Sequence, residues 1–138
     1  MLKLLLLFTA GGLIYGGIEV AHRGFTHISM FIVGGICFLL IGAMGHIRTF
    51  SGGIPVTVRM LLGSVIITLL ELVSGLIVNV WLNLDVWDYT DKPFNFMGQI
   101  CLRASAMWVF LTLFGVYAYR FASYRMFGEK QSPFRALP

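Results

Sequence analysis

Charged residues are scarce in this chain: of its 138 residues, 12% are charged and 58% are hydrophobic. Soluble domains carry about 25% charged residues, so this chain has too little charge to cover a water-exposed surface. The net charge of +4 is spread along the sequence and gathers mainly near its C-terminus. It forms no concentrated basic patch of the kind that binds nucleic acid. The composition therefore indicates a polytopic membrane protein whose partner is the lipid bilayer, with no nucleic acid.

The motifs of common enzymes and metal sites are also missing. The two cysteines, Cys37 and Cys101, form no CxxC pair and have no zinc-type spacing. No HExxH motif, Gly-x-Ser-x-Gly motif or phosphate-binding loop occurs. We therefore expect no metal and no cofactor, and the chain alone lacks the means to hydrolyse ATP. Enzymatic activity is not favoured, although the sequence leaves it open.

The chain does contain four long apolar segments, each close to the roughly 20 residues that cross a bilayer as a helix. They cover about residues 4–21, 28–47, 60–82 and 97–119. A spanning segment must satisfy its own backbone hydrogen bonds, and the short linkers favour antiparallel neighbours. The sequence therefore predicts an all-α protein. We expect a compact four-helix transmembrane bundle over residues 1–123 and a basic C-terminal tail, 124–138, that is disordered or lies on the membrane surface.

Basic residues predict the orientation, because Lys and Arg accumulate in cytoplasmic loops. With the N-terminus inside, the cytoplasmic side carries Lys3, Arg48, Arg59, Arg120, Arg125, Lys130 and Arg135. The outside then carries only Arg23, Lys92 and Arg103. Both termini are therefore expected in the cytoplasm, with Trp81, Trp87 and Tyr89 at the outer interface.

Glycines add a second expectation, because Gly12 and Gly16 have the spacing that lets helices approach closely in lipid. They favour packing inside the bundle and leave a homodimer interface as the alternative.

Two glutamates lie inside the apolar segments, where a carboxylate is costly and commonly functional. Glu19 follows Tyr15 and precedes Arg23 at intervals of one helical turn, so the three share one face of the first segment. Glu71 falls near the middle of the third segment, and Asn79 lies two turns further on the same face. These side chains mark a polar site within the membrane.

Arg103 lies in the outer half of the fourth segment, at a depth close to that of Glu19 and Asn79. A carboxylate and a guanidinium neutralise one another in lipid, so we expect an acidic residue to pair with Arg103. With two carboxylates and one guanidinium, one carboxylate is left to bind a cation or take up a proton. The predicted substrate- or proton-binding site opens to the outside and comprises Glu19, Glu71, Arg103, Asn79 and Tyr15, with His27 and Arg23 as possible helpers.

The linker before the fourth segment carries Trp87, Asp88, Tyr89 and Asn95. The Asp88 side chain is expected to bond local backbone, and Asn95 is expected to cap the fourth helix. One interpretation is an ordered loop anchored at the interface by its aromatic residues. The other is a lid over the Glu–Arg site.

One block of motif positions extends from the third segment to the fourth. It reads Glu71-Leu72-x-x-Gly75, then Trp87-Asp88-Tyr89-x-x-x-Pro93-x-Asn95-x-x-Gly98-Gln99-Ile100-Cys101-Leu102, and Trp108. Through this block the sequence resembles the ABC-transporter type IV (CmpB) family of bacterial membrane proteins, over roughly residues 12–119. The resemblance implies a multi-span protein of the bacterial inner membrane that acts as a transporter permease. The matching motif positions are Glu71, Trp87, Asp88, Tyr89, Pro93, Asn95 and Gly98.

Three classes of function remain open, of which transport is favoured. A transporter or transporter subunit would work as a homodimer or with a partner membrane subunit, and Glu71 would bind a proton or a small substrate, a small cation included. A membrane-embedded enzyme would act on a lipid or lipid-linked substrate, with Glu71 or Glu19 as general base and Arg103 holding an acidic group. A haem- or quinone-binding sensor or accessory protein is the third class.

Overall fold

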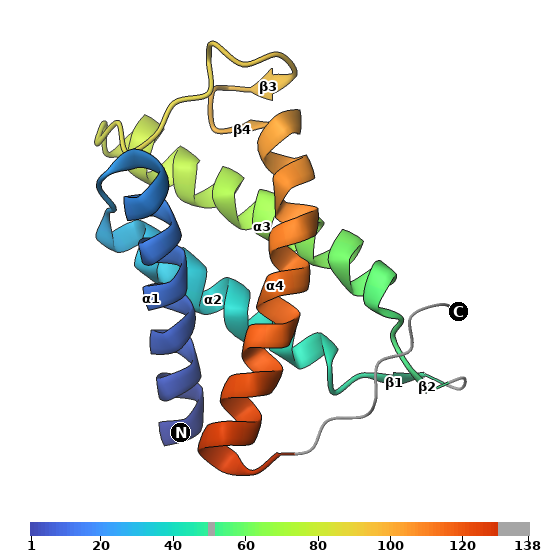
Figure 1. Ribbon diagram of the computed structural model, residues 1–138. Coiled ribbons are helices and arrows are strands. Elements are labelled where there is room, and N and C mark those ends of the chain that lie inside the picture. Colours follow the sequence, from blue (N-terminus) through green and yellow to red (C-terminus); the bar gives the residue numbers. More distant parts are fainter. Residues whose placement is uncertain (50–51, 130–138) are drawn as a thin grey trace.

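The computed structural model describes residues 1–49 and 52–129, and they are mostly helical, as predicted (Figure 1). The α-helices are α1 (Leu2–Arg23), α2 (Ile28–Met44), α3 (Val56–Gly75) and α4 (Leu102–Phe127). Helix α3 continues directly into a π-helical stretch, η1 (Leu76–Trp81). Two short antiparallel pairs complete the described residues: β1 (Arg48–Thr49) with β2 (Gly52–Gly53), and β3 (Asn95–Phe96) with β4 (Ile100–Cys101).

Three helical stretches within residues 1–49 and 52–129 are long and apolar enough to cross a membrane. They are α1, the continuous run of α3 with η1, and α4. Helix α2 is shorter, with 17 residues, and ends at Met44 instead of at 47 as predicted. It ends early because the amide groups of Gly45 and His46 turn back to carbonyl groups three residues before them, and the chain then enters β1.

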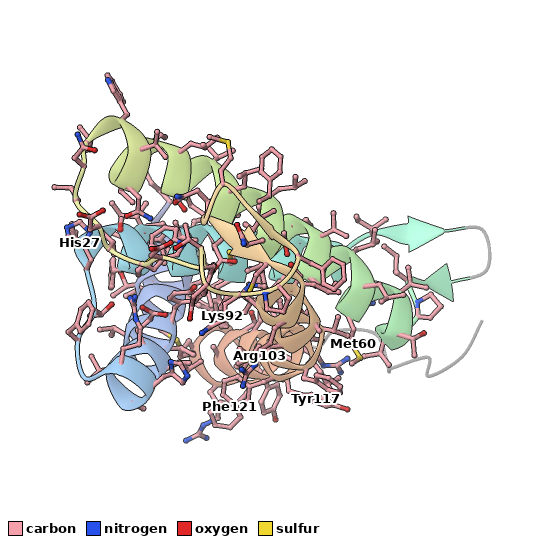
Figure 2. All side chains as sticks on the ribbon, turned by 90° about the horizontal axis from the view of Figure 1, so that it is seen from above. His27, Met60, Lys92, Arg103, Tyr117 and Phe121 are labelled. Atoms are coloured by element: carbon pink, nitrogen blue, oxygen red, sulfur yellow. The ribbon has the colours of Figure 1, made fainter. Side chains whose placement is uncertain are left out.

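The helices pack as two pairs. Helix α1 contacts α2 most extensively, α3 contacts α4, and α2 also contacts both α3 and α4. In Figure 1, α1 and α4 stand upright while α3 crosses α4 obliquely, and α3 also runs across the view from above in Figure 2. Helix α3 therefore lies across α4, whereas α1 and α4 run in similar orientations in this view.

Glycines bring α1 and α2 together. Gly11 and Gly12 are buried on α1, opposite buried Gly34 and Gly35 on α2. A Cβ atom on Gly12 would lie 2.7 Å from both the ring and the carbonyl oxygen of Phe31, a separation that real side chains do not reach. Small residues allow this approach between helices in lipid. The buried Gly12 thus packs within the chain, as the favoured interpretation expected.

Hydroxyl groups connect α3 to α4. The Ser64 hydroxyl donates to the Ser105 carbonyl oxygen at 2.6 Å, and the Thr68 hydroxyl donates to the Ser105 hydroxyl at 3.0 Å. Next to them, Gly63 leaves room for the fully buried side chain of Thr112. This pair is therefore joined by hydrogen bonds as well as by close packing.

Helix α4 is displaced along the sequence from the predicted segment 97–119. It begins only at Leu102, because Met97 and Gly98 both adopt positive φ angles, of 53° and 69°, that no helix passes through. Cys101 is its N-cap and accepts a bond from the Ala104 amide at 3.4 Å, so the expectation that Asn95 caps this helix is wrong. The helix ends at Gly128, in the left-handed conformation typical of a C-cap. Residues 124–127 of the predicted tail are thus helical, and 130–138 lie outside the described residues.

The two ends of the molecule differ. The start of α1 meets the end of α4, where Lys3 forms an ion pair with Glu129 and lies over the Phe127 ring. The opposite end holds the turn between α1 and α2 and the long connection from η1 to α4, including β3 and β4 (Figure 1). The candidate site lies toward this second end.

Candidate functional site

Glu71 is the most deeply enclosed acidic residue of the described chain, with 2% of its side chain exposed. Its Oε1 accepts a hydrogen bond from the Tyr89 hydroxyl at 3.1 Å, and its Oε2 accepts one from the Trp108 indole N–H at 2.9 Å. No cation forms an ion pair with it anywhere in residues 1–49 or 52–129. The carboxyl group is therefore held by two neutral donors, one from the η1–α4 connection and one from α4.

Tyr15 adds α1 to this arrangement. Its ring stacks on Trp108, with ring centroids 5.7 Å apart and an interplanar angle of 25°. Trp108 is buried among residues of α2 and α3, including Cys37 and Ile67. The side chain that donates to Glu71 is thus fixed by three other helices. The grouping of Tyr15 near Glu71 agrees with the predicted site, although Tyr15 is a ring neighbour of Trp108 and no hydrogen bond joins it to the carboxylate.

Tyr89 is half-buried, and its backbone amide donates to the Gly98 carbonyl at 2.8 Å, which holds the residue in place. Burial, and next the charge of Glu71, raise the pKa of the Tyr89 phenol well above its ordinary value. The phenol therefore keeps its proton at neutral pH and remains a hydrogen-bond donor to Glu71.

A pocket of about 350 Å³ lies beside Glu71, between α1, α4 and the connection that precedes β3. Its polar lining comprises Glu19, His22, Tyr89, Lys92, Arg103 and Trp108. The remaining lining is formed by Ile18 from α1, Cys101 from β4, and Ala104, Met107 and Leu111 from α4. Tyr89 and Trp108, the two donors to Glu71, both line this pocket, so Glu71 lies directly behind its wall.

Glu19 and Arg103 line the same pocket but do not form the ion pair that the sequence suggested. Glu19 is instead paired with Arg23, one helical turn further along α1. Arg103 is exposed and takes part in no ion pair in the described part of the chain (Figure 2). The local partner is preferred because residues four apart on a helix already lie side by side.

Arg23 connects α1 to the long connection. Besides pairing with Glu19, its guanidinium donates to the Val86 carbonyl oxygen at 2.8 Å. Arg23 therefore holds Glu19 and the backbone of the connection, and it is not among the residues that line the pocket.

Asn79 is hydrogen-bonded to the connection between η1 and α4. Its amide donates to the Trp87 carbonyl at 3.0 Å and to the Gln99 side-chain oxygen at 2.9 Å, and its own oxygen accepts from the Val86 amide at 2.7 Å. It lies in the π-helical stretch, where wider turns depart from the regular helical spacing used to place it next to Glu71. Asn79 therefore holds the connection in place and is not part of the pocket wall.

Trp87, which was expected at the membrane interface, is instead buried beside these contacts. Trp87 is buried, with 7% exposed, and its indole N–H donates to the Gln99 carbonyl at 3.0 Å. Trp81 remains 76% exposed. The buried backbone of the connection needs polar partners, and Asn79 and Gln99 supply them.

The rest of the connection is ordered by its own side chains. Asp88 accepts hydrogen bonds from the backbone and hydroxyl groups of Thr90, both at 2.8 Å, as expected for local bonding. Asn95 donates to the Lys92 carbonyl at 2.8 Å and accepts from the Gly98 amide at 3.1 Å. The segment is thus an ordered loop that also places Tyr89 and Lys92 on the pocket.

The suggested helper His27 lies at the N-cap of α2, where its Nδ1 accepts from the Ser29 amide at 3.2 Å. It is not among the residues around the pocket.

Sequence reasoning assigned no site role to His22 or Lys92, which line the pocket, or to Gln99, which bonds Asn79 and so supports the connection. His22 follows Ile18 by one helical turn, so helical spacing could have identified it. Over residues 1–49 and 52–129, no group of three potential metal-binding side chains occurs.

Comparison with known proteins places these positions in a family context. The sequence model of a family described as "Putative ABC-transporter type IV" matches residues 11–136. No curated protein matches the chain, and no solved structure matches it.

Proposed function

The chain belongs to the type IV ABC-transporter family, and from this premise we propose that it is a membrane-embedded transporter or transporter subunit. The pocket beside Glu71 is its binding site. The observation that carries this proposal is a buried carboxylate whose two hydrogen-bond donors both line one pocket. A movement of Tyr89 or Trp108 at the pocket wall therefore alters the hydrogen bonds to Glu71. A change in the charge of Glu71 alters, in turn, how these two side chains are held.

Glu71 is the proton-binding group of this site. No cation pairs with Glu71 within residues 1–49 and 52–129, so its charge is compensated there by two hydrogen bonds alone and a proton can supply the missing positive partner. Tyr89 bonds Glu71 through its hydroxyl and also lines the pocket, so this hydroxyl offers a route for a proton between them. Glu71 itself does not line the pocket, which gives less support to a role as general base acting on a bound lipid.

The helices cross the cytoplasmic membrane of a bacterium with both termini inside. The start of α1 and the end of α4 lie at one end of the molecule, where Lys3 and Arg125 provide basic charge. The pocket and the loop around Tyr89 lie toward the opposite end, which then faces outward. This orientation makes the site accessible from the cell exterior.

A second protein chain completes the transport pathway. Four helices are too few to enclose a route across a bilayer around one lateral pocket. We therefore propose a homodimer or a complex with a partner membrane subunit, in which the outer surface of this chain contributes part of the pathway.

The test is proton flux into liposomes that contain the purified protein and an entrapped pH-sensitive dye. A potassium gradient with valinomycin sets the membrane potential. Flux is expected with the unaltered chain and should fall at least about tenfold in Glu71→Gln, which has no acidic proton to exchange. Glu129→Gln is the matched control, since this glutamate forms its ion pair at the other end of the molecule. Equal flux in the unaltered protein and Glu71→Gln would refute the proposed role of Glu71.

A further inference from the structure

We infer that the pocket takes an amphipathic anion, in which an acidic head group binds Arg103 and a hydrocarbon chain lies along Ile18, Met107 and Leu111. This inference rests on the proposed function, because it names the substrate class of the same pocket. It also replaces the small cationic substrate considered from the sequence.

The charges around the pocket favour an anion. Arg103 is exposed at the pocket and has no acidic partner within the described ranges 1–49 and 52–129. Glu19 supplies the acidic charge of the described lining, and its carboxylate is already paired with Arg23. A bound cation would therefore meet an uncompensated guanidinium, whereas a carboxylate or phosphate would accept charge-assisted hydrogen bonds from it.

Lys92 adds to the positive charge on the loop side of the pocket. Its amino group donates to the neighbouring Asp91 at 2.6 Å, and this pair is well exposed to solvent. Exposed pairs of this kind are weak and exchange readily, so an incoming acidic head group can compete with Asp91 for Lys92. In the view from above in Figure 2, the labelled residues Lys92 and Arg103 lie close together. Both of these basic residues line the pocket.

The apolar wall of the pocket favours a ligand that also carries a hydrocarbon chain. Arg103, Met107 and Leu111 follow one another at intervals of one turn on α4, so they line one face of the helix over about 12 Å. Ile18 faces the same pocket from α1. A polar head at the Arg103 end and a chain directed toward Leu111 match this order of side chains. A small hydrophilic anion would leave the apolar wall without a contact.

The ligand would also lie against the side chains that hold Glu71. Trp108 lines the pocket from α4, and Tyr89 lines it from the loop. An occupant in the 350 Å³ space therefore contacts both donors to the buried carboxylate. This contact links occupancy of the pocket to the proposed proton site.

Binding can be followed by quenching of Trp108 fluorescence with a spin-labelled fatty acid, in nanodiscs of zwitterionic lipid. Trp81→Phe serves as the background, because Trp81 is 76% exposed and would respond to any lipid-dissolved quencher. The acid should quench saturably, and its methyl ester and the corresponding amine should bind at least about tenfold more weakly. Adding Trp108→Phe should remove the saturable signal, which assigns it to this pocket.

The decisive variants remove a guanidinium at either end of α4. Arg103→Gln should reduce the affinity for the acid to that for the ester, and Arg103→Lys should retain part of it. Arg125→Gln is the matched control, an exposed arginine near the other end of the same helix, and should change nothing. Met107→Phe should weaken binding by narrowing the apolar wall, and it tests the site without altering its charge or adding a tryptophan to the quenching signal.

Equal affinity for the acid, the ester and the amine would overturn the inference, and so would equal losses in Arg103→Gln and Arg125→Gln. Displacement of the acid by inorganic phosphate alone, at similar concentration, would also overturn it by showing that no chain is needed. Flux that depends on Glu71 without anion-selective binding would leave transport standing and remove this ligand class. Arg103-dependent binding of the acid without any flux would support this ligand class and remove the transport function.

Discussion

The two helix pairs of this protein are held together in different ways. Between α1 and α2, buried glycines let the backbones approach until Phe31 lies against Gly12. Between α3 and α4, hydroxyl groups bond across the interface and Glu71 accepts from Trp108. Lipid offers little hydrophobic driving force between helices, so close packing and hydrogen bonding are the two available means. The pocket lies between α1 of one pair and α4 of the other; the ion-paired Glu19 of α1 lines it, and the buried Glu71 of α3 lies behind its wall.

The largest effect is expected from Gly12→Leu, which breaks the glycine-packed pair. A Cβ atom at this position meets both the ring and the backbone of Phe31, and backbone cannot move aside cheaply. Overpacking typically costs about 1–3 kcal/mol and occasionally more, and a clash with backbone belongs at the upper end of this range. Thermal unfolding in detergent should show a large loss of stability or no folded protein. Gly17→Leu is the control on the same helix, because its Cβ would meet nothing within 4 Å. Equal stability of the two variants would mean that α1 does not pack on α2 in this register.

The second effect is expected from Glu71→Leu in the hydrogen-bonded pair. It leaves the Tyr89 hydroxyl and the Trp108 indole N–H without their acceptor. An unpaired buried donor costs about 1–3 kcal/mol. Chemical or thermal unfolding should therefore show a loss that is partly recovered when Trp108→Phe is added, since the second change removes one orphaned donor. Purely additive losses in a double-mutant cycle would contradict this pairing.

A smaller effect is expected from Thr68→Val, which removes one hydroxyl bond between α3 and α4. The bond to Ser105 is 3.0 Å long, and the substitution keeps the side-chain shape. Hydrogen bonds between helices in a bilayer are worth about 0.6 kcal/mol on average. A shift of this size in the unfolding equilibrium is expected, and Thr57→Val on the exposed start of α3 should give none. A loss as large as that of Gly12→Leu would remove the contrast between the two pairs.

The smallest effect concerns pH and Tyr89. Because burial and the neighbouring Glu71 raise its pKa in the folded chain, the folded state holds this proton more tightly than the unfolded state does. The resulting stability is complete below the unfolded value and is lost as the pH rises beyond about 10. Tyr89→Phe should therefore flatten the fall in melting temperature above this pH, whereas Tyr124→Phe, on the exposed face of α4, should leave it unchanged. An identical alkaline profile in all three proteins would contradict the burial of Tyr89.

Several parts of the site could be predicted because they depend on spacing along one helix. The stripe of Tyr15, Glu19 and Arg23 is one example, since its ion pair joins residues four apart. Glu71 was identified by its position in an apolar run, and its burial agrees with that reasoning. The two donors to Glu71 were not identified, because Tyr89 lies in the loop and Trp108 on another helix, and neither side chain is charged.

The sequence by itself determined the helical class, the approximate extent of the apolar segments and the few polar residues within them, because these depend on composition and on the 3.6-residue period of one helix. The tertiary structure alone decided which of those residues meet. It turned Asn79 toward the loop through a π-helical turn and gave Glu71 two neutral donors. It also left Arg103 on the pocket without an acidic partner in the described chain. Contacts between helices depend on crossing geometry and on small changes of helical phase, which no local sequence pattern records.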